Sequence, residues 1–236
     1  MLLWATICAL GKPRLYMAEA FAQARRIGVD GLGLVLLMGA LSGGVLSQQT
    51  ANQLSAGLPL EIIAGSLVGG MLTELGPVLT AIVLAGRMGA GIGAELGTMQ
   101  VTNQIDALLT LGRDPVVELV VPRVVAGTLI LIPLVVLANI SGILAGFAVC
   151  VTLLDLTTQQ FAAGARGFYH HAALVYTLLK AVVFGFTITF TACYVGLRAG
   201  GGAAGVGRTA TKAVVAIIIA VMVLDVVLGP AYKAFT

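Results

Sequence analysis

Charged residues are scarce in this chain of 236 residues: Asp, Glu, Lys and Arg make up only 10%, and the formal net charge is +3. A soluble domain carries about 25% charged residues. Hydrophobic residues reach 59%, and the mean hydropathy is +1.05. This composition excludes an ordinary soluble domain and predicts a membrane protein. Because the sequence has no basic stripe with interleaved aromatics, we also expect no nucleic-acid binding.

Paired cysteines and clustered metal ligands are missing too. The cysteines, none of them in a CxxC motif, are Cys8, Cys150 and Cys193. Isolated cysteines within apolar runs pack as small hydrophobic residues, so we expect no disulfide. His170 and His171 adjoin, but neighbours on a helix point in different directions and no third ligand is near. We therefore predict that the chain binds no metal.

Long uncharged runs are abundant, and each is near the ~20 residues that cross a bilayer. The predicted spans are residues 31–50, 62–86, 116–151, 172–197 and 213–232. Apolar positions in residues 13–26 suit a helix lying in the membrane interface, although a short cytosolic helix fits as well. With no tandem repeat or linker, residues 1–236 read as a single domain. Most lysines and arginines fall in one set of loops, which predicts a cytoplasmic N-terminus and an outward C-terminus.

Small residues recur every four positions through the second span and beyond it. The row consists of Ala81, Ala85, Gly89, Gly93 and Gly97. Such a row forms a groove that lets another helix approach closely, either within the chain or in a second copy. Shorter pairs occur at Gly39–Gly43, Gly65–Gly69 and Gly142–Gly146. In a chain with 31 glycines, we attribute these isolated pairs to chance.

Residues 97–112 (GTMQVTNQIDALLTLG) form the most polar connection between spans. Val101, Ile105 and Leu108 recur at helical spacing, with Leu109 adjoining, while the amides and Asp106 fall mostly elsewhere. This pattern predicts an amphipathic helix of about three turns that ends at a glycine. Such a helix could dock into a groove of a soluble partner or fold back onto its own spans, and the pattern leaves both open.

The centre of the chain resembles the MlaE/YrbE family of ABC-transporter permeases. The motifs that carry the resemblance are ELGP at 74–77, AGR at 85–87, AELGTM at 94–99, VTNQIDAL at 101–108, DP at 114–115 and PR at 122–123. Weaker similarity extends it to residues 12–230. The sequence departs from many relatives at Thr73, where they place a basic residue.

This resemblance implies an all-α membrane protein with five transmembrane helices, an N-terminal interfacial helix and a cytoplasmic coupling helix at 97–112. It also implies partners: a second copy of the chain, a cytoplasmic ABC ATPase dimer that holds the ATP and Mg, and an MCE-domain protein on the outer side. The chain itself would bind no cofactor and catalyse no reaction. The residues expected to couple it to the ATPase are Glu95, Met99, Val101, Gln104, Ile105, Asp106, Leu108 and Leu109.

The relatives move lipids, commonly glycerophospholipids, between membranes. The resemblance therefore places the chain in a bacterial inner membrane, with the plastid inner envelope as the alternative.

In the third span the uncharged run is 127–151, and its helix is expected to start near Val116, below the membrane surface. The charges expected within the membrane are therefore Glu74, Lys180 and Asp225. Buried membrane charges are costly and usually face a partner or a watery cavity. Lys180 and Asp225 have matching depths and opposite signs, which predicts an ion pair between the fourth and fifth spans. That pair could hold two helices together or contact lipid headgroups. The resemblance places all three residues near the cavity that holds the lipid.

Two other classes of protein remain as alternatives. An ion-coupled transporter or channel could use Glu74, Lys180 and Asp225 as a proton relay, but the chain lacks inverted repeats. An intramembrane enzyme would need a nucleophile–base pair or a metal cluster, and the sequence contains neither HExxH nor GxSxG. Residues 202–209 (GAAGVGRT) approach the phosphate-loop spacing except at Arg208. Since a phosphate loop follows a buried strand, we predict a compact turn there instead.

Overall fold

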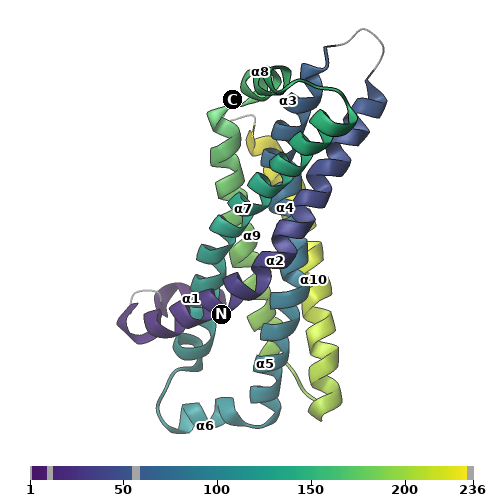
Figure 1. The fold of residues 1–236 in the computed structure, drawn as a ribbon. Coiled ribbons are helices and arrows are strands. Elements are labelled where there is room, and N and C mark those ends of the chain that lie inside the picture. The colour runs from purple at the N-terminus through teal and green to yellow at the C-terminus, as the bar shows by residue number, and fades with distance from the viewer. Residues whose placement is uncertain (1, 10–12, 55–58, 233–236) are drawn as a thin grey trace. The chain divides into compact units, whose positions relative to one another are not determined.

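The structure is a computed structural model that describes residues 2–9, 13–54 and 59–232. Within these ranges the chain folds into helices without strands, and five helical segments are long and apolar enough to cross a membrane (Figure 1). These segments are Tyr16–Gln53, Glu61–Val101, Val116–Leu153, His171–Gly196 and Gly202–Pro230. The prediction of an all-α membrane protein with five spans is therefore confirmed.

Several spans are built from more than one helical segment. The first contains α2 (Pro13–Gln53), preceded by α1 (Leu2–Ala9). The second consists of α3 (Glu61–Gly70), the π-helix η1 (Met71–Leu75), α4 (Gly76–Leu84), the π-helix η2 (Ala85–Gly89) and α5 (Ala90–Val101). Then follow α6 (Gln104–Thr110), the π-helix η3 (Val116–Val120), α7 (Val121–Leu153), α8 (Thr158–Phe168), α9 (His171–Gly196) and α10 (Gly202–Tyr232).

The first span differs from the sequence prediction. Residues 13–26 were expected as a separate interfacial helix before a span at 31–50, yet α2 is one continuous helix of 41 residues. The sequence changes from polar to apolar near residue 30. A change in polarity alters what a helix side contacts, but it removes no main-chain hydrogen bond. Without a proline in that region, the helix continues.

The contacts of the chain divide into two compact units. Unit 1 comprises residues 1–31, 81–132 and 182–224. Unit 2 comprises residues 32–80, 133–181 and 225–236. Each unit is therefore assembled from three stretches of sequence that lie far apart along the chain.

In unit 1, the small-residue row of the second span packs within the chain. Side chains at Gly89 and Gly93 would meet Ile217 and Ala213 of α10; a Cβ at Gly93 would lie 3.2 Å from the Cβ of Ala213. Gly97 similarly faces Ala199, at 3.1 Å. Gly89 and Gly93 thus bring the second span close to α10, and all three glycines face residues of their own chain.

In unit 2, glycines allow α2 to cross α7 at close range. A Cβ at Gly43 would overlap the main-chain carbonyl of Gly142, and one at Gly39 would overlap the carbonyl oxygen of Ala138. Gly146 in turn faces Leu67 and Ser47. Attributing the pairs Gly39–Gly43 and Gly142–Gly146 to chance was therefore wrong, because two backbones meet there.

Replacing Gly43 with alanine is expected to destabilise the protein. The new methyl group would displace the backbone of α7, and such overpacking costs about 1–3 kcal/mol. Gly33→Ala, in the same helix, is the matched control, since no described atom lies within 4 Å of a Cβ built there. Unfolding of the two purified variants in detergent measures the difference. Equal stability of both would contradict the close crossing.

The short helix α8 completes unit 2 and packs on α3 (Figure 1). Thr157 caps its first turn through a reciprocal capping box with Gln160. Phe161 is buried against Phe147, with ring centroids 4.9 Å apart. Beyond α8, His170 Nδ1 lies 3.0 Å from the carbonyl oxygen of Phe168.

Candidate functional site

The polar connection predicted at 97–112 is two helices where one was expected. α5 ends at Val101, and Asn103 adopts a left-handed conformation with φ of 56° before α6 begins at Gln104. Asparagine tolerates this conformation better than most residues. The end of α6 was predicted at a glycine, and Gly112 has φ of 72°. In Figure 1, α6 lies at the bottom, joined to α5 on one side.

The two sides of α6 have different surroundings. Ile105 is buried, with 7% of its surface exposed, and Leu108 is half-buried. Leu109 and Leu111 are 57% and 73% exposed, and Asp106 is exposed as well. Ile105, one of the residues expected to couple the chain to the ATPase, is thus buried within its own chain. The apolar surface left for a partner consists of Leu109 and Leu111.

A groove of about 580 Å³ lies next to α6. Met99, Gln104 and Leu108 line it together with Arg123 of α7. Val101, at the end of α5, is half-buried. Ile105 lines the groove as well, so four of the residues expected to couple the chain to a partner lie there. Of these four, Gln104 is exposed, Met99 and Leu108 are half-buried and Ile105 is buried.

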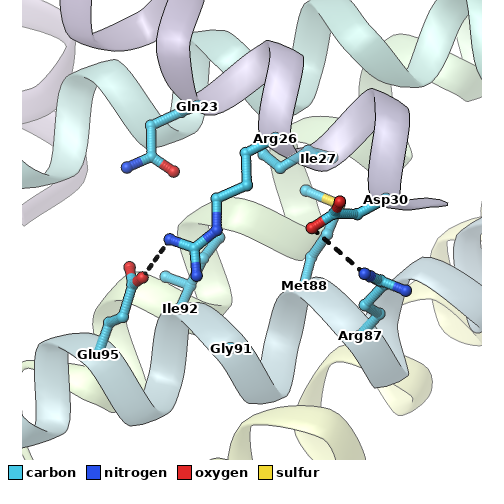
Figure 2. A pocket seen from close by; sticks show the side chains of 9 residues that line it. All are labelled: Gln23, Arg26, Ile27, Asp30, Arg87, Met88, Gly91, Ile92 and Glu95. Atoms are coloured by element: carbon cyan, nitrogen blue, oxygen red, sulfur yellow. Dashed lines mark hydrogen bonds and ion pairs between the residues drawn. The ribbon is translucent and has the colours of Figure 1, made fainter.

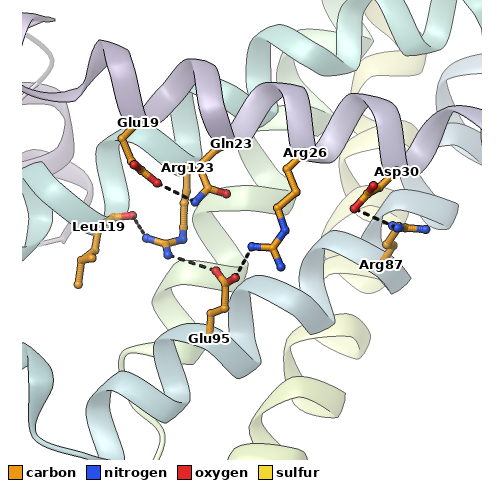
Figure 3. Close-up of polar contacts among 8 residues, drawn as sticks. All are labelled: Glu19, Gln23, Arg26, Asp30, Arg87, Glu95, Leu119 and Arg123. Carbon is orange, nitrogen blue, oxygen red and sulfur yellow. Dashed lines mark hydrogen bonds and ion pairs between the residues drawn. The ribbon is translucent and has the colours of Figure 1, made fainter.

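Glu95 is the centre of a charge network in unit 1 (Figure 3). Arg26 Nη1 of α2 lies 2.6 Å from Glu95 Oε1, and Arg123 Nη2 of α7 lies 3.2 Å from Glu95 Oε2. Arg123 also donates to the carbonyl of Leu119 at 2.7 Å, and only 6% of its side chain is exposed. One carboxylate of α5 thus joins α2 and α7.

Beside this network lies a pocket of about 160 Å³ (Figure 2). It is lined by Arg26 and Asp30 of α2 and by Arg87, Met88 and Glu95 of the second span, among others. Arg87 Nη2 lies 3.3 Å from Asp30 Oδ2, so the charged side chains of the pocket are arranged as two ion pairs. The ion pairs that line the pocket connect the first two spans electrostatically.

Sequence reasoning did not find the partners of Glu95. Arg26 and Arg123 are 69 and 28 residues away along the chain. The sequence feature that could have indicated this pairing is position, because Arg26, Arg123 and Glu95 each lie near an end of a predicted span.

The three charges expected within the membrane all belong to unit 2, and they meet at Lys180, which is completely buried. Its Nζ lies 2.7 Å from Asp225 Oδ1, so the structure contains the expected pair between α9 and α10. It also lies 2.9 Å from Glu74 Oε2 and donates to the carbonyl of Thr73 at 2.8 Å. The involvement of Glu74 was not predicted.

This arrangement places two carboxylates around one ammonium group. The side chain of Glu74 is 51% exposed, that of Asp225 is 19% exposed and that of Lys180 is 0% exposed. Removing the cation from such a site would leave the mostly buried carboxylate of Asp225 without its ion-pair partner, which is destabilising. In the ranges that the structure describes, no group of three or more His, Cys, Asp or Glu residues could hold a metal.

Residues 202–209, predicted as a compact turn, are instead the first two turns of α10. Gly201 and Gly202 have φ of 82° and 68°, and this glycine pair makes the turn that precedes the helix. Thr209, where a phosphate loop has a hydroxyl for Mg²⁺, donates to the carbonyl of Gly205 in its own helix.

Comparison with known proteins identifies a single family. A family model described as permease MlaE matches residues 20–230. A probable ABC transporter permease protein of Rickettsia prowazekii is 39% identical over 209 residues, which cover 89% of this chain and 81% of that protein. A similarly named protein of Synechocystis is 35% identical over 210 residues, covering 89% and 80%. The chloroplastic protein TRIGALACTOSYLDIACYLGLYCEROL 1 of Arabidopsis thaliana is 33% identical over 218 residues, covering 92% and 62%.

Proposed function

Because this chain belongs to the MlaE family of ABC transporter permeases, we propose that it moves lipids between membranes, driven by ATP hydrolysis on a separate subunit. The observation that carries this proposal is the exposed apolar end of α6. Ile105 and the Glu95 network fix α6 and α5 to unit 1, while Leu109 and Leu111 remain exposed outside the five spans. A fixed helix with exposed leucines suits a soluble partner that pushes on the membrane part.

The proposal includes the partners and orientation that the sequence predicts. The basic loops place the N-terminus and α6 in the cytoplasm of a bacterial cell, where an ATPase dimer holding ATP and Mg would bind. A second copy of the chain and an outer MCE-domain protein would complete the transporter. Bacterial relatives support the inner membrane, and the chloroplastic relative keeps the plastid envelope as the alternative.

The proposed cargo is a glycerolipid, most simply a glycerophospholipid. The Arabidopsis relative is named after trigalactosyldiacylglycerol, which is a diacylglycerol lipid. The proposed place for the headgroup is the cluster of Glu74, Lys180 and Asp225, where a half-exposed carboxylate lies inside a span. Charged residues at such depth usually mark a pathway through the membrane.

Reconstitution of the purified chain tests the proposal. Alone in liposomes it is expected to hydrolyse no ATP, whereas together with its ATPase it should transfer labelled phospholipid between vesicles only when ATP is present. ATP hydrolysis by the chain alone would contradict the assignment. Transport driven by a proton gradient without ATP would instead support an ion-coupled transporter that uses Glu74, Lys180 and Asp225.

A further inference from the structure

The second span is broken at η1, between α3 and α4. The N–H of Gly76 donates to the carbonyl of Met71, five residues earlier, so the carbonyl of Leu72 loses its α-helical donor. Pro77 has no N–H, and the carbonyl of Thr73 loses its α-helical donor as well. Two consecutive carbonyls of one span are thus left open. In a bilayer, every main-chain polar group must be satisfied within the protein.

Two side chains of α9 donate to these carbonyls. The hydroxyl of Thr177, which is 2% exposed, lies within hydrogen-bond distance of two carbonyls, that of Leu72 and, at 2.9 Å, that of Ala173 in its own helix. Its single proton satisfies the carbonyl of Leu72 when it points away from Ala173. The ammonium of Lys180, which has no exposed surface, donates to the carbonyl of Thr73 at 2.8 Å. Residues three apart lie on the same face of a helix. One face of α9 therefore presents two donors to two consecutive carbonyls of the second span.

We propose that Thr177 and Lys180 are positioning residues of the transport site, which hold the break in the second span and thereby orient Glu74. The residue that they orient follows directly after Thr73, and its carboxylate is also bound by Lys180. The importance of Glu74 for lipid transport rests on the function proposed above. The hydrogen bonds that orient Glu74 are independent of that function.

The ammonium of Lys180 is surrounded by protein groups and has no exposed surface. It donates hydrogen bonds to the carbonyl of Thr73 and to the carboxylate of Glu74, and it forms an ion pair with Asp225 at 2.7 Å. A lipid phosphate could reach Lys180 only by displacing one of these partners. Lys180 therefore acts through Glu74, whose half-exposed carboxylate is the group left to meet a headgroup.

A competing interpretation is that Lys180 serves only as the counter-ion of Glu74 and Asp225. The two interpretations differ in the role of Pro77. Replacing Pro77 with alanine supplies an N–H to the carbonyl of Thr73, which should then depend less on Lys180. It supplies nothing to Asp225. Removal of the carboxylate of Asp225 breaks an ion pair of Lys180 but leaves the hydrogen bond to Thr73.

Thermal unfolding of the full chain in nanodiscs separates these roles. Lys180→Met should lower the unfolding temperature, and Pro77→Ala in the same chain should restore part of that loss. Pro77→Ala should restore nothing in the matched control Asp225→Asn. If the effects of Lys180→Met and Pro77→Ala simply add, the proposed role of Lys180 in holding the break is overturned.

The orientation of residue 74 can be measured directly. We expect Glu74→Cys to react with a water-soluble maleimide at a rate that changes about tenfold when Thr177→Val is added, since one buried carbonyl then loses its donor. Thr177→Ser keeps the hydroxyl and should keep the rate. Thr187→Val is the matched control, because Thr187 donates only within its own helix, to Val183.

An unchanged labelling rate in Thr177→Val would overturn the positioning role of Thr177. Both readouts are independent of lipid transport. If the cargo of the protein proves to be something else, the results of the unfolding and labelling experiments still decide whether α9 holds the break.

Discussion

A chain with aspartate at both Leu109 and Leu111 is expected to fold and insert normally but to lose ATP-driven transport. Both side chains are exposed at the end of α6, so the substitutions should leave the packing of unit 1 intact. Charges placed in the apolar centre of an interface remove contacts of the kind that cost about 2 kcal/mol or more each. The two losses together amount to about 4 kcal/mol, so transport in reconstituted vesicles should fall by about 1,000-fold, while hydrolysis by the ATPase persists without coupling.

The matched control is Leu153→Asp, which makes the same change at an exposed leucine at the end of α7. This variant should retain transport, because Leu153 is not part of α6. Ile105→Asp should behave differently from both, since it buries a charge and should impair folding. Normal transport by the double α6 variant would exclude its exposed end as the site of coupling.

The number of spans was predictable from the sequence because the bilayer imposes it. A crossing requires about 20 apolar residues, and the uncharged runs of this chain provide five such stretches. The same rule explains why the start of α2 was misjudged. Polarity indicates where a helix leaves the membrane, whereas the helix itself ends only where its hydrogen bonds are interrupted.

The interruptions were harder to predict, since they depend on a single residue each. Asn103 separates α5 from α6 through one left-handed conformation, and the apolar spacing of Val101, Ile105 and Leu108 continues across it as if one helix were present. The π-helix η1 inserts one extra residue into a turn. Neither feature changes the hydrophobic period enough to be recognised in a sequence.

The candidate site was predictable only for residues whose depth in the membrane and sign of charge were enough to identify a partner. Lys180 and Asp225 could be paired because each lies within a straight apolar run. Glu74 could not be assigned to the same cluster, because its direction depends on the break at η1 and Pro77. The partners of Glu95 were missed because predicting an ion pair between distant spans requires knowing which helices pack against each other. The glycine crossing of α2 and α7 was missed for the same reason.

Reversing the charge of Glu95 is expected to have the largest effect on stability among charge changes outside the Lys180 cluster. In Glu95→Arg, the nearly buried guanidinium of Arg123 would face two further cations, Arg26 and the new arginine. Breaking a buried ion pair costs about 3–5 kcal/mol; because Glu95 is 35% exposed, we expect about 2 kcal/mol or more. Denaturant unfolding in detergent measures this loss.

Adding Arg123→Glu to Glu95→Arg rebuilds one ion pair with the opposite polarity and should recover part of the stability. Recovery should remain incomplete, because Arg26 still faces an arginine at position 95. Asp30→Arg provides the control, since it breaks a pair whose side chains are both 48% exposed. Exposed pairs contribute about 0–1 kcal/mol, so a loss as large as that of Glu95→Arg would mean that burial of Arg123 does not explain the strength of the network. A small loss in the control together with partial recovery in the swap would show that one buried guanidinium makes Glu95 the joint between α2, α5 and α7.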